Sequence, residues 1–247
     1  AAEVTILVLL PWLEVTRRGV YSNFSRHRQA LNNLRNGLKE QGIGLVVRRA
    51  FVPSAFFNMR TGLLRWFVLS SLPALLSQVR RFRPDIVHCR YYYAARLALA
   101  ARRLAGAKYR VIFDLRSLLP EQGLVNGQWS QDSRAFRDWK ALERKMLLDA
   151  DRVVSVSPAM TGRVSDGNPG LRVETIPNFV DLERFRPDEN SRRELRRELG
   201  IEERRVLVFC GTLGGRYPGD RIAECVRIYF SAFGPESFFL LLSPSDE

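Results

Sequence analysis

Short apolar runs alternate along the chain with longer stretches of helical periodicity, and this alternation is the strongest constraint on the fold. The first six runs lie at 4–10, 43–52, 85–88, 109–113, 152–156 and 171–176. Between them, apolar residues recur at helical spacing, as in Leu31, Leu34 and Leu38. Strands that alternate with helices through short turns predict a parallel sheet covered by helices on both faces. We therefore expect residues 1–176 to form a doubly wound, Rossmann-like α/β domain.

The alternation restarts after position 176 and is unfinished where the sequence stops. Prolines and charged residues mark 177–190 as an interdomain linker. A charged helix, a strand, a second helix and a last strand are then expected, near 191–199, 206–210, 220–230 and 238–242. Residues 191–247 are too few to close a second Rossmann-like domain. We expect them to be the start of such a domain in a truncated chain.

The net charge of +13 favours anionic partners such as phosphorylated substrates or acidic lipids. Nucleic acid is not expected, because the basic residues form no motif of a known nucleic-acid-binding module. The stretch 56–83 mixes Trp66 and other apolar residues with five arginines. It is interpreted as a core-packing helix with solvated arginines, and peripheral contact with an anionic membrane stays open as the alternative.

Cysteine usage and the N-terminus both indicate a cytoplasmic protein. Cys89, Cys210 and Cys225 lie in apolar runs without CxxC spacing, so they are expected to be free, buried thiols. The apolar run that ends at Pro11 lacks a basic start and is interpreted as a first strand, not a signal peptide. Attachment to the inner face of the membrane is the further option for location.

The most specific motif is IPNFVDLERFRP at 176–187, followed by ELGI at 198–201 and VLVFCGTL at 206–213. Looser motifs precede it: PDIVHCR at 84–90, VIFDLR at 111–116 and ADRVVSVS at 150–157. In this order the segments resemble the family 4 retaining glycosyltransferases. The resemblance implies the GT-B architecture of two Rossmann-like domains, with the acceptor on the first domain and a nucleotide-sugar donor on the second. An ordinary proline-containing linker is the alternative for 176–187.

Polar residues follow two strands of the predicted sheet, at the edge where ligands of doubly wound folds bind. His88 and Arg90 end one strand, and Asp114 and Arg116 end the next. Two guanidinium groups suit a phosphate or a hydroxyl-bearing acceptor, so Arg90 and Arg116 are predicted to bind the acceptor. His88 and Asp114 are the predicted catalytic residues, although a histidine at a strand end is often only structural. Many relatives carry a histidine at the place of Asp114.

Two glycine-containing turns are the predicted donor phosphate sites. The first, at 14–20, precedes a helix, and the second, at 211–220, lies between a strand and a helix. Backbone N–H groups and a helix N-terminus in such turns can bind phosphate. The predicted phosphate-binding residues are Gly19, Arg18, Gly214, Gly215, Arg216 and Arg221. The second turn resembles the GTLGGWY form of the family, and a solvated glycine turn is the alternative.

The resemblance implies retaining transfer of a sugar from a nucleoside-diphosphate sugar to a glycan, a lipid-linked molecule or a small molecule. No metal or other cofactor is expected, because the sequence has no cluster of acidic ligands. The family's paired glutamates would lie beyond Glu247, so this chain by itself is expected to be inactive. The alternative is a non-catalytic binding or assembly lobe that needs a partner for its missing half.

Overall fold

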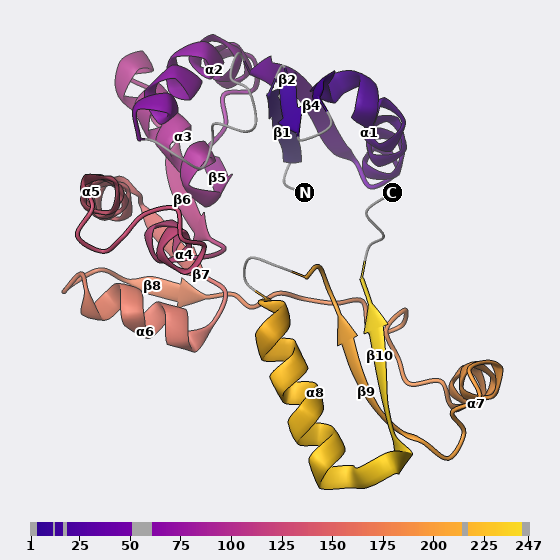
Figure 1. Cartoon of the computed structure of the whole chain (residues 1–247). Helices are drawn as coiled ribbons and strands as arrows, with labels where there is room; N and C mark the ends of the chain where they lie inside the picture. The colour runs from indigo at the N-terminus through magenta and orange to yellow at the C-terminus, as the bar shows by residue number, and fades with distance from the viewer. Residues whose placement is uncertain (1–3, 12, 17–18, 51–60, 214–216, 244–247) are drawn as a thin grey trace. The chain divides into compact units, whose positions relative to one another are not determined.

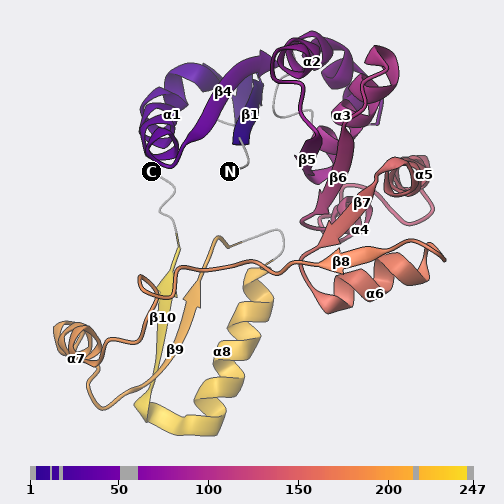
Figure 2. The same cartoon turned by 180° about the vertical axis from the view of Figure 1, so that it is seen from behind.

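The computed structural model describes residues 4–11, 13–16, 19–50, 61–213 and 217–243. They belong to two compact units, Ala1–Pro177 and Asn178–Glu247. We call these unit 1 and unit 2 (Figures 1 and 2).

Unit 1 begins with a parallel strand pair. β1 (Val4–Pro11) pairs with β4 (Ile43–Ala50) from Val4↔Ile43 to Pro11↔Ala50, and α1 (Asn23–Glu40) lies between them in sequence. The strands β2 (Leu13–Thr16) and β3 (Gly19–Ser22) form an antiparallel pair before α1. Sequence analysis expected only a turn here. The backbone register pairs Val15 with Val20 and Thr16 with Gly19, so a short hairpin stands where only a turn was expected.

The centre of unit 1 is a four-stranded parallel sheet, separate in its hydrogen bonding from the β1–β4 pair. Its strands, in spatial order, are β5 (Ile86–Arg90), β6 (Arg110–Leu115), β7 (Arg152–Ser155) and β8 (Val173–Thr175). Helical segments join them: α3 (Tyr91–Ala105), then α4 (Leu119–Val125) with α5 (Arg134–Asp149), then α6 (Pro158–Asp166). Parallel strands with helical crossovers confirm the predicted fold class.

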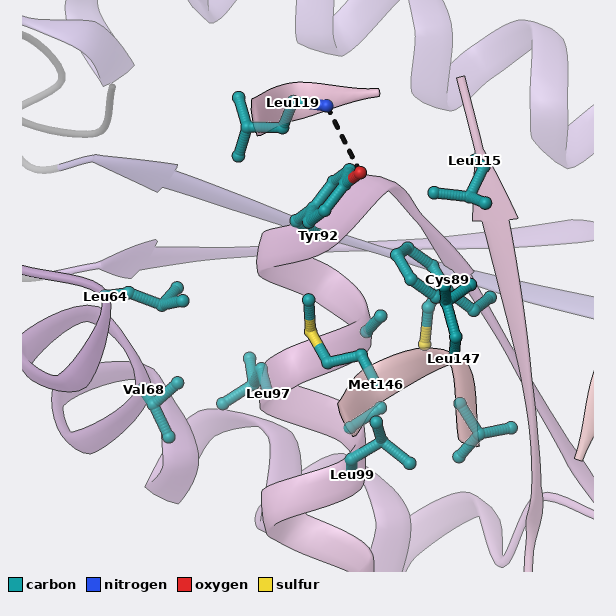
Figure 3. Close-up of a cluster of buried hydrophobic side chains, with 14 of the residues drawn as sticks. Leu64, Val68, Cys89, Tyr92, Leu97, Leu99, Leu115, Leu119, Met146 and Leu147 are labelled. Atoms are coloured by element: carbon teal, nitrogen blue, oxygen red, sulfur yellow. Dashed lines mark hydrogen bonds between the residues drawn. The ribbon is translucent and has the colours of Figure 1, made fainter. Parts of the chain in front are cut away.

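A core of aliphatic and aromatic side chains holds the helices against this sheet (Figure 3). α3 contributes Leu97 and Leu99, and α5 contributes Met146 and Leu147. Tyr92 is fully buried at the start of α3. Its ring meets Phe113 edge-on at a centroid distance of 5.3 Å, and its hydroxyl accepts a hydrogen bond from Leu119 N at 3.2 Å. The core therefore fixes the start of α3 against β6, next to the carboxyl ends of the strands.

α2 (Thr61–Phe82) has the core-packing face that sequence analysis favoured for this stretch. Leu64, Phe67 and Val68 are buried, whereas Trp66 and Leu69 are 67% and 62% exposed. Among the described residues, no helix has both the length and the apolar content needed to span a membrane.

Asp151, at the start of β7, joins three elements of unit 1. Its carboxylate accepts a hydrogen bond from Val111 N at 2.7 Å and pairs with Arg102 of α3. A second Arg102 nitrogen donates to the Asp149 carbonyl at 2.6 Å. Burial opposes ionisation of Asp151, but the Val111 and Arg102 contacts outweigh it and hold its pKa below the ordinary 3.8. The Asp151 carboxylate is thus a structural group.

Asp151→Asn is expected to reduce the free energy of unfolding by about 1 kcal/mol at neutral pH, because it removes a charged acceptor. The carboxylate is 39% exposed, so solvent screening limits the effect. Since the folded pKa is depressed, this stability is present above the unfolded pKa and is lost as pH falls through the folded value. Urea unfolding at pH 7 and pH 3 tests this, with Asp132→Asn as control. If the Asp151→Asn variant lost the same free energy of unfolding at both pH values, the predicted dependence on ionisation of Asp151 would be wrong.

Unit 2 contains α7 (Glu189–Glu198), β9 (Arg205–Cys210), α8 (Gly219–Phe233), a 3-10 turn (Gly234–Glu236) and β10 (Ser237–Leu242). β9 and β10 pair in parallel. Neither α7 nor α8 has a buried residue. Cys89 of unit 1 is buried as predicted, but Cys210 and Cys225 are exposed, so the prediction of burial was wrong for these two. A two-stranded sheet with one helix beside it buries too little surface to enclose the side chains of Cys210 and Cys225.

Candidate functional site

Four polar residues meet at the carboxyl ends of β5 and β6. Arg90 and Asp114 are register partners in the parallel pair. His88 lies two residues before Arg90 on β5, and Arg116 lies two residues after Asp114, just past the end of β6. Side chains two residues apart lie on the same face of a strand. The structure therefore brings together the catalytic and acceptor-binding residues that the sequence predicted. Their roles stay a prediction.

Asp114 is the centre of this cluster. Its Oδ2 lies 3.3 Å from His88 Nε2 and 3.7 Å from an Arg116 guanidinium nitrogen. The Asp114 side chain is only 9% exposed, whereas that of His88 is 61% exposed. Asp114 Oδ1 is buried and has no hydrogen-bond partner within the described part of the chain. A buried carboxylate oxygen without a donor is costly, and a hydroxyl of a bound molecule would satisfy it.

The chemistry of the two side chains determines which of them can donate and which can accept in the His88–Asp114 contact. An ionised carboxylate only accepts, so a hydrogen bond between the two side chains requires the proton on His88 Nε2. In the neutral imidazole this leaves Nδ1 as an acceptor. Because His88 is mostly exposed, that acceptor is within reach of a ligand at the strand ends. The pair can therefore orient a hydroxyl group and take up its proton.

A strained turn directly after β5 brings further polar groups to the same edge. Tyr91 has φ +74° and changes the chain from strand to helix in one residue. Positive φ is rare for a bulky residue and is typical of functional sites. The Tyr91 hydroxyl lies 3.3 Å from both Gln122 Oε1 and Ser117 Oγ, and Ser117 donates to Gln122 at 2.8 Å. Sequence analysis missed these three residues, because no motif marks them and the φ angle is invisible in a sequence.

A buried network fixes the helices behind the edge. Glu143 of α5 accepts hydrogen bonds from Tyr92 and Lys140, and Lys140 also pairs with Glu121 of α4 at 3.0 Å. Burial raises the pKa of Glu143, although Lys140 and Tyr92 favour its ionised form. Burial opposes the charge on Lys140, but its hydrogen bond to Glu143 prevails and raises its pKa. The network links α3, α4 and α5, so the backbone under the site is rigidly supported.

The predicted donor residues are only partly described. Arg18, Gly214, Gly215 and Arg216 lie outside the described residues. Gly19 is the first residue of β3, paired with Thr16. Arg221 lies in the first turn of α8 and its guanidinium is 3.2 Å from Glu224 Oε2, exposed to solvent. The second turn does run from the end of β9 to the start of α8, as a phosphate-binding turn requires. The donor roles stay predictions.

Metal ligation was not expected for this chain. In the described ranges, no three His, Cys, Asp or Glu side chains gather as a metal site. Independence from a metal stays a prediction.

Residues 31–184 match the family model of Glycosyltransferase Family 4. This range is well over half of the chain and includes β4 to β8 and the whole His88–Asp114 cluster. No curated protein sequence matches.

Solved structures of glycosyltransferases share the fold at low sequence identity. Anabaena Alr3699/HepE in complex with UDP has a TM-score of 0.56 at 16% identity, over 87% of this chain and 51% of that one. Sucrose-phosphate synthase from Thermosynechococcus elongatus has 0.54 at 15%, over 97% and 71%. Phytolacca americana apo UGT2 has 0.53 at 11%, over 98% and 58%. The chain thus spans about half the length of HepE. The matches confirm the predicted GT-B type of Rossmann-like fold.

Proposed function

The chain belongs to glycosyltransferase family 4, and from this membership we infer that it transfers a sugar from a nucleoside-diphosphate sugar to an acceptor bound on unit 1. The protein is proposed to act with retention of configuration, as sequence analysis expected. The acceptor is a glycan, a lipid-linked molecule or a small molecule with a free hydroxyl group. HepE, which shares the fold, has been solved with UDP and with UDP and glucose together, and this supports a nucleoside-diphosphate donor.

The observation that carries the proposal is the unpartnered Asp114 Oδ1 at the carboxyl edge of the sheet. Sugar-transfer acceptors present hydroxyl groups, and Asp114 is a buried acceptor of hydrogen bonds with His88 3.3 Å away. In the proposed complex His88 Nδ1 accepts the proton of the attacking hydroxyl while Asp114 holds the ring. Arg90 and Arg116 bind phosphate or hydroxyl groups elsewhere on the acceptor.

The proposed donor site lies in unit 2, at the turn between β9 and α8. Gly214, Gly215 and Arg216 would contact the departing diphosphate, with Arg221 as a further cation. Catalysis then rests on positioning the two substrates and on neutralising the negative charge of the leaving group. No metal has a part in this proposal.

Calorimetric titration of the full-length protein with UDP, GDP and ADP tests the proposal. Micromolar binding of one diphosphate would support the transferase and identify the class of donor. Binding of none would instead favour a non-catalytic lobe that assembles with a partner. The exposed apolar residues of unit 2, such as Val208, Leu241 and Leu242, are the observation in favour of that second candidate.

Arg216→Ala in the full-length protein is expected to weaken binding of the preferred diphosphate by about 1–3 kcal/mol, since a charge-assisted hydrogen bond is lost. The dissociation constants from calorimetry measure the effect. Arg227→Ala in α8 is the matched control, because it removes one arginine charge from unit 2 at a position outside the turn. Equal affinities of the Arg216→Ala variant and the unmodified protein would remove Arg216 from the donor site.

A further inference from the structure

A groove of about 610 Å³ lies at the opposite edge of the four-stranded sheet, where β5 and β6 begin. Its charged and apolar lining includes Arg83, Asp85, Ile86, Lys108 and Arg110. We call it the amino-edge groove. Substrates of doubly wound folds bind at the carboxyl ends of the strands, so this groove is separate from the His88–Asp114 cluster. It is not needed for sugar transfer as proposed above.

The amino-edge groove is strongly cationic. The side chains of Arg83, Lys108 and Arg110 are exposed and form no hydrogen bond or ion pair within the described residues. Asp85 is the one acidic residue in the whole segment 61–110, which contains ten Lys and Arg residues. Three unpaired cations against one carboxylate leave a net positive charge, which favours an anionic partner.

Helix ends explain only part of this charge. Arg80 and Arg81 end α2, and Arg102 and Arg103 end α3, where cations offset the negative end of the helix dipole. Lys108 and Arg110 follow α3 by several residues and are not explained in this way. Arg83 follows α2 with φ +43°, a conformation that normally selects glycine at a helix end. A bulky cation stands here at a cost in backbone energy that glycine would avoid.

Exposed apolar side chains accompany these cations. Ile86 lines the groove and is 55% exposed. Phe82, directly before Arg83, is 37% exposed, and Leu104 in the last turn of α3 is 68% exposed. A soluble phosphate would need the cations alone. Cations beside exposed apolar groups match the interface of an anionic bilayer, where cations meet phosphates and apolar side chains reach the acyl boundary.

We propose that the amino-edge groove, which includes Ile86, and the exposed Phe82 and Leu104 in the last turns of α2 and α3 dock unit 1 on an anionic lipid bilayer. Arg83, Lys108 and Arg110 contact the phosphates of the lipid headgroups. Sequence analysis left a membrane contact open for 56–83 as a whole, and the groove places that contact at the end of this stretch and on β5 and β6. The proposal does not depend on sugar transfer, because the groove and the carboxyl edge share no residue.

Flotation of the full-length protein with vesicles of phosphatidylglycerol and phosphatidylcholine tests this docking. The triple variant Arg83→Gly, Lys108→Gln and Arg110→Gln is expected to lose on the order of a hundredfold in vesicle affinity, as each cation contributes about fivefold near the surface. Arg83→Gly also relieves the positive φ, so the variant is expected to fold. A control triple in α7, with Arg192, Arg193 and Arg197 each replaced by Gln, changes the net charge equally and should stay within twofold.

Three results would overturn the proposal. One is the absence of vesicle binding by the unmodified protein, and another is an equal loss in the groove and α7 triples. The third is displacement of the protein from vesicles by glycerol 3-phosphate or single-stranded RNA through the groove cations, because the partner would then be a soluble anion or RNA. The proposal also expects that Ile86→Ser with Leu104→Ser weakens vesicle binding tenfold or more and leaves glycerol 3-phosphate binding unchanged.

Discussion

Gly123→Ala is expected to reduce the free energy of unfolding of unit 1 by about 3–5 kcal/mol. A Cβ built on Gly123 would lie 2.0 Å from Trp129 Cζ2 and 2.1 Å from Cε2, far inside contact distance. Trp129 is 8% exposed, and its Nε1 donates to the Pro120 carbonyl at 2.9 Å, so the indole has no room to retreat. Expelling a buried tryptophan costs about 3–5 kcal/mol. That is a large part of the about 5–15 kcal/mol that holds a typical domain folded.

Urea unfolding measures this effect, and Gly162→Ala is the matched control. Gly162 lies inside α6 with nothing within 4 Å of an added Cβ, so alanine should stabilise the helix by about 0.5–1 kcal/mol. If alanine lowers the free energy of unfolding at Gly123 and raises it at Gly162, the loss at Gly123 comes from the clash with Trp129 and not from helix propensity. The double variant Gly123→Ala with Trp129→Ala should be no less stable than Trp129→Ala alone. Wild-type stability of the Gly123→Ala variant would contradict the packing of Trp129 on α4.

The central sheet could be predicted because its strands are short, apolar and separated by helical spacing. β6 was expected at 109–113 and is Arg110–Leu115, and β7 was expected at 152–156 and is Arg152–Ser155. Burial on a parallel sheet requires such continuous apolar runs, so the pattern itself carries the information. The His88–Asp114 cluster could be predicted for the same reason, since parallel strands end at one edge.

Backbone strain and long-range packing could not be predicted. Tyr91 adopts φ +74° because the buried Tyr92 and the hydrogen bonds of the Tyr91 hydroxyl hold it there, and nothing local favours that angle. The close approach of Gly123 to Trp129 is also a matter of tertiary structure. A local sequence pattern indicates the conformation that a residue prefers, whereas the conformations at these positions are determined by contacts with residues distant in sequence.

Asp114→Asn is expected to reduce sugar transfer by about a hundredfold, as for loss of a group that supports proton transfer. In the unmodified protein His88 Nε2 lies 3.3 Å from the charged Asp114 carboxylate. Asparagine keeps the shape of that side chain but presents an NH₂ group or a neutral oxygen to His88 Nε2. The imidazole then loses its fixed tautomer and the acceptor hydroxyl loses its orientation. Release of nucleoside diphosphate from the preferred donor by the full-length protein measures the rate.

The decisive control is a double-mutant cycle with His88→Ala. If Asp114 acts through His88, the double variant should be about as slow as either single variant, because groups that act as a unit are not additive. Calorimetric affinity for the diphosphate should be unchanged in all three, since the cluster is assigned to the acceptor side. Multiplicative losses would show that Asp114 and His88 act independently. A parallel loss of diphosphate affinity would move the cluster to the donor side, where the unpartnered Asp114 Oδ1 would meet a hydroxyl of the transferred sugar instead.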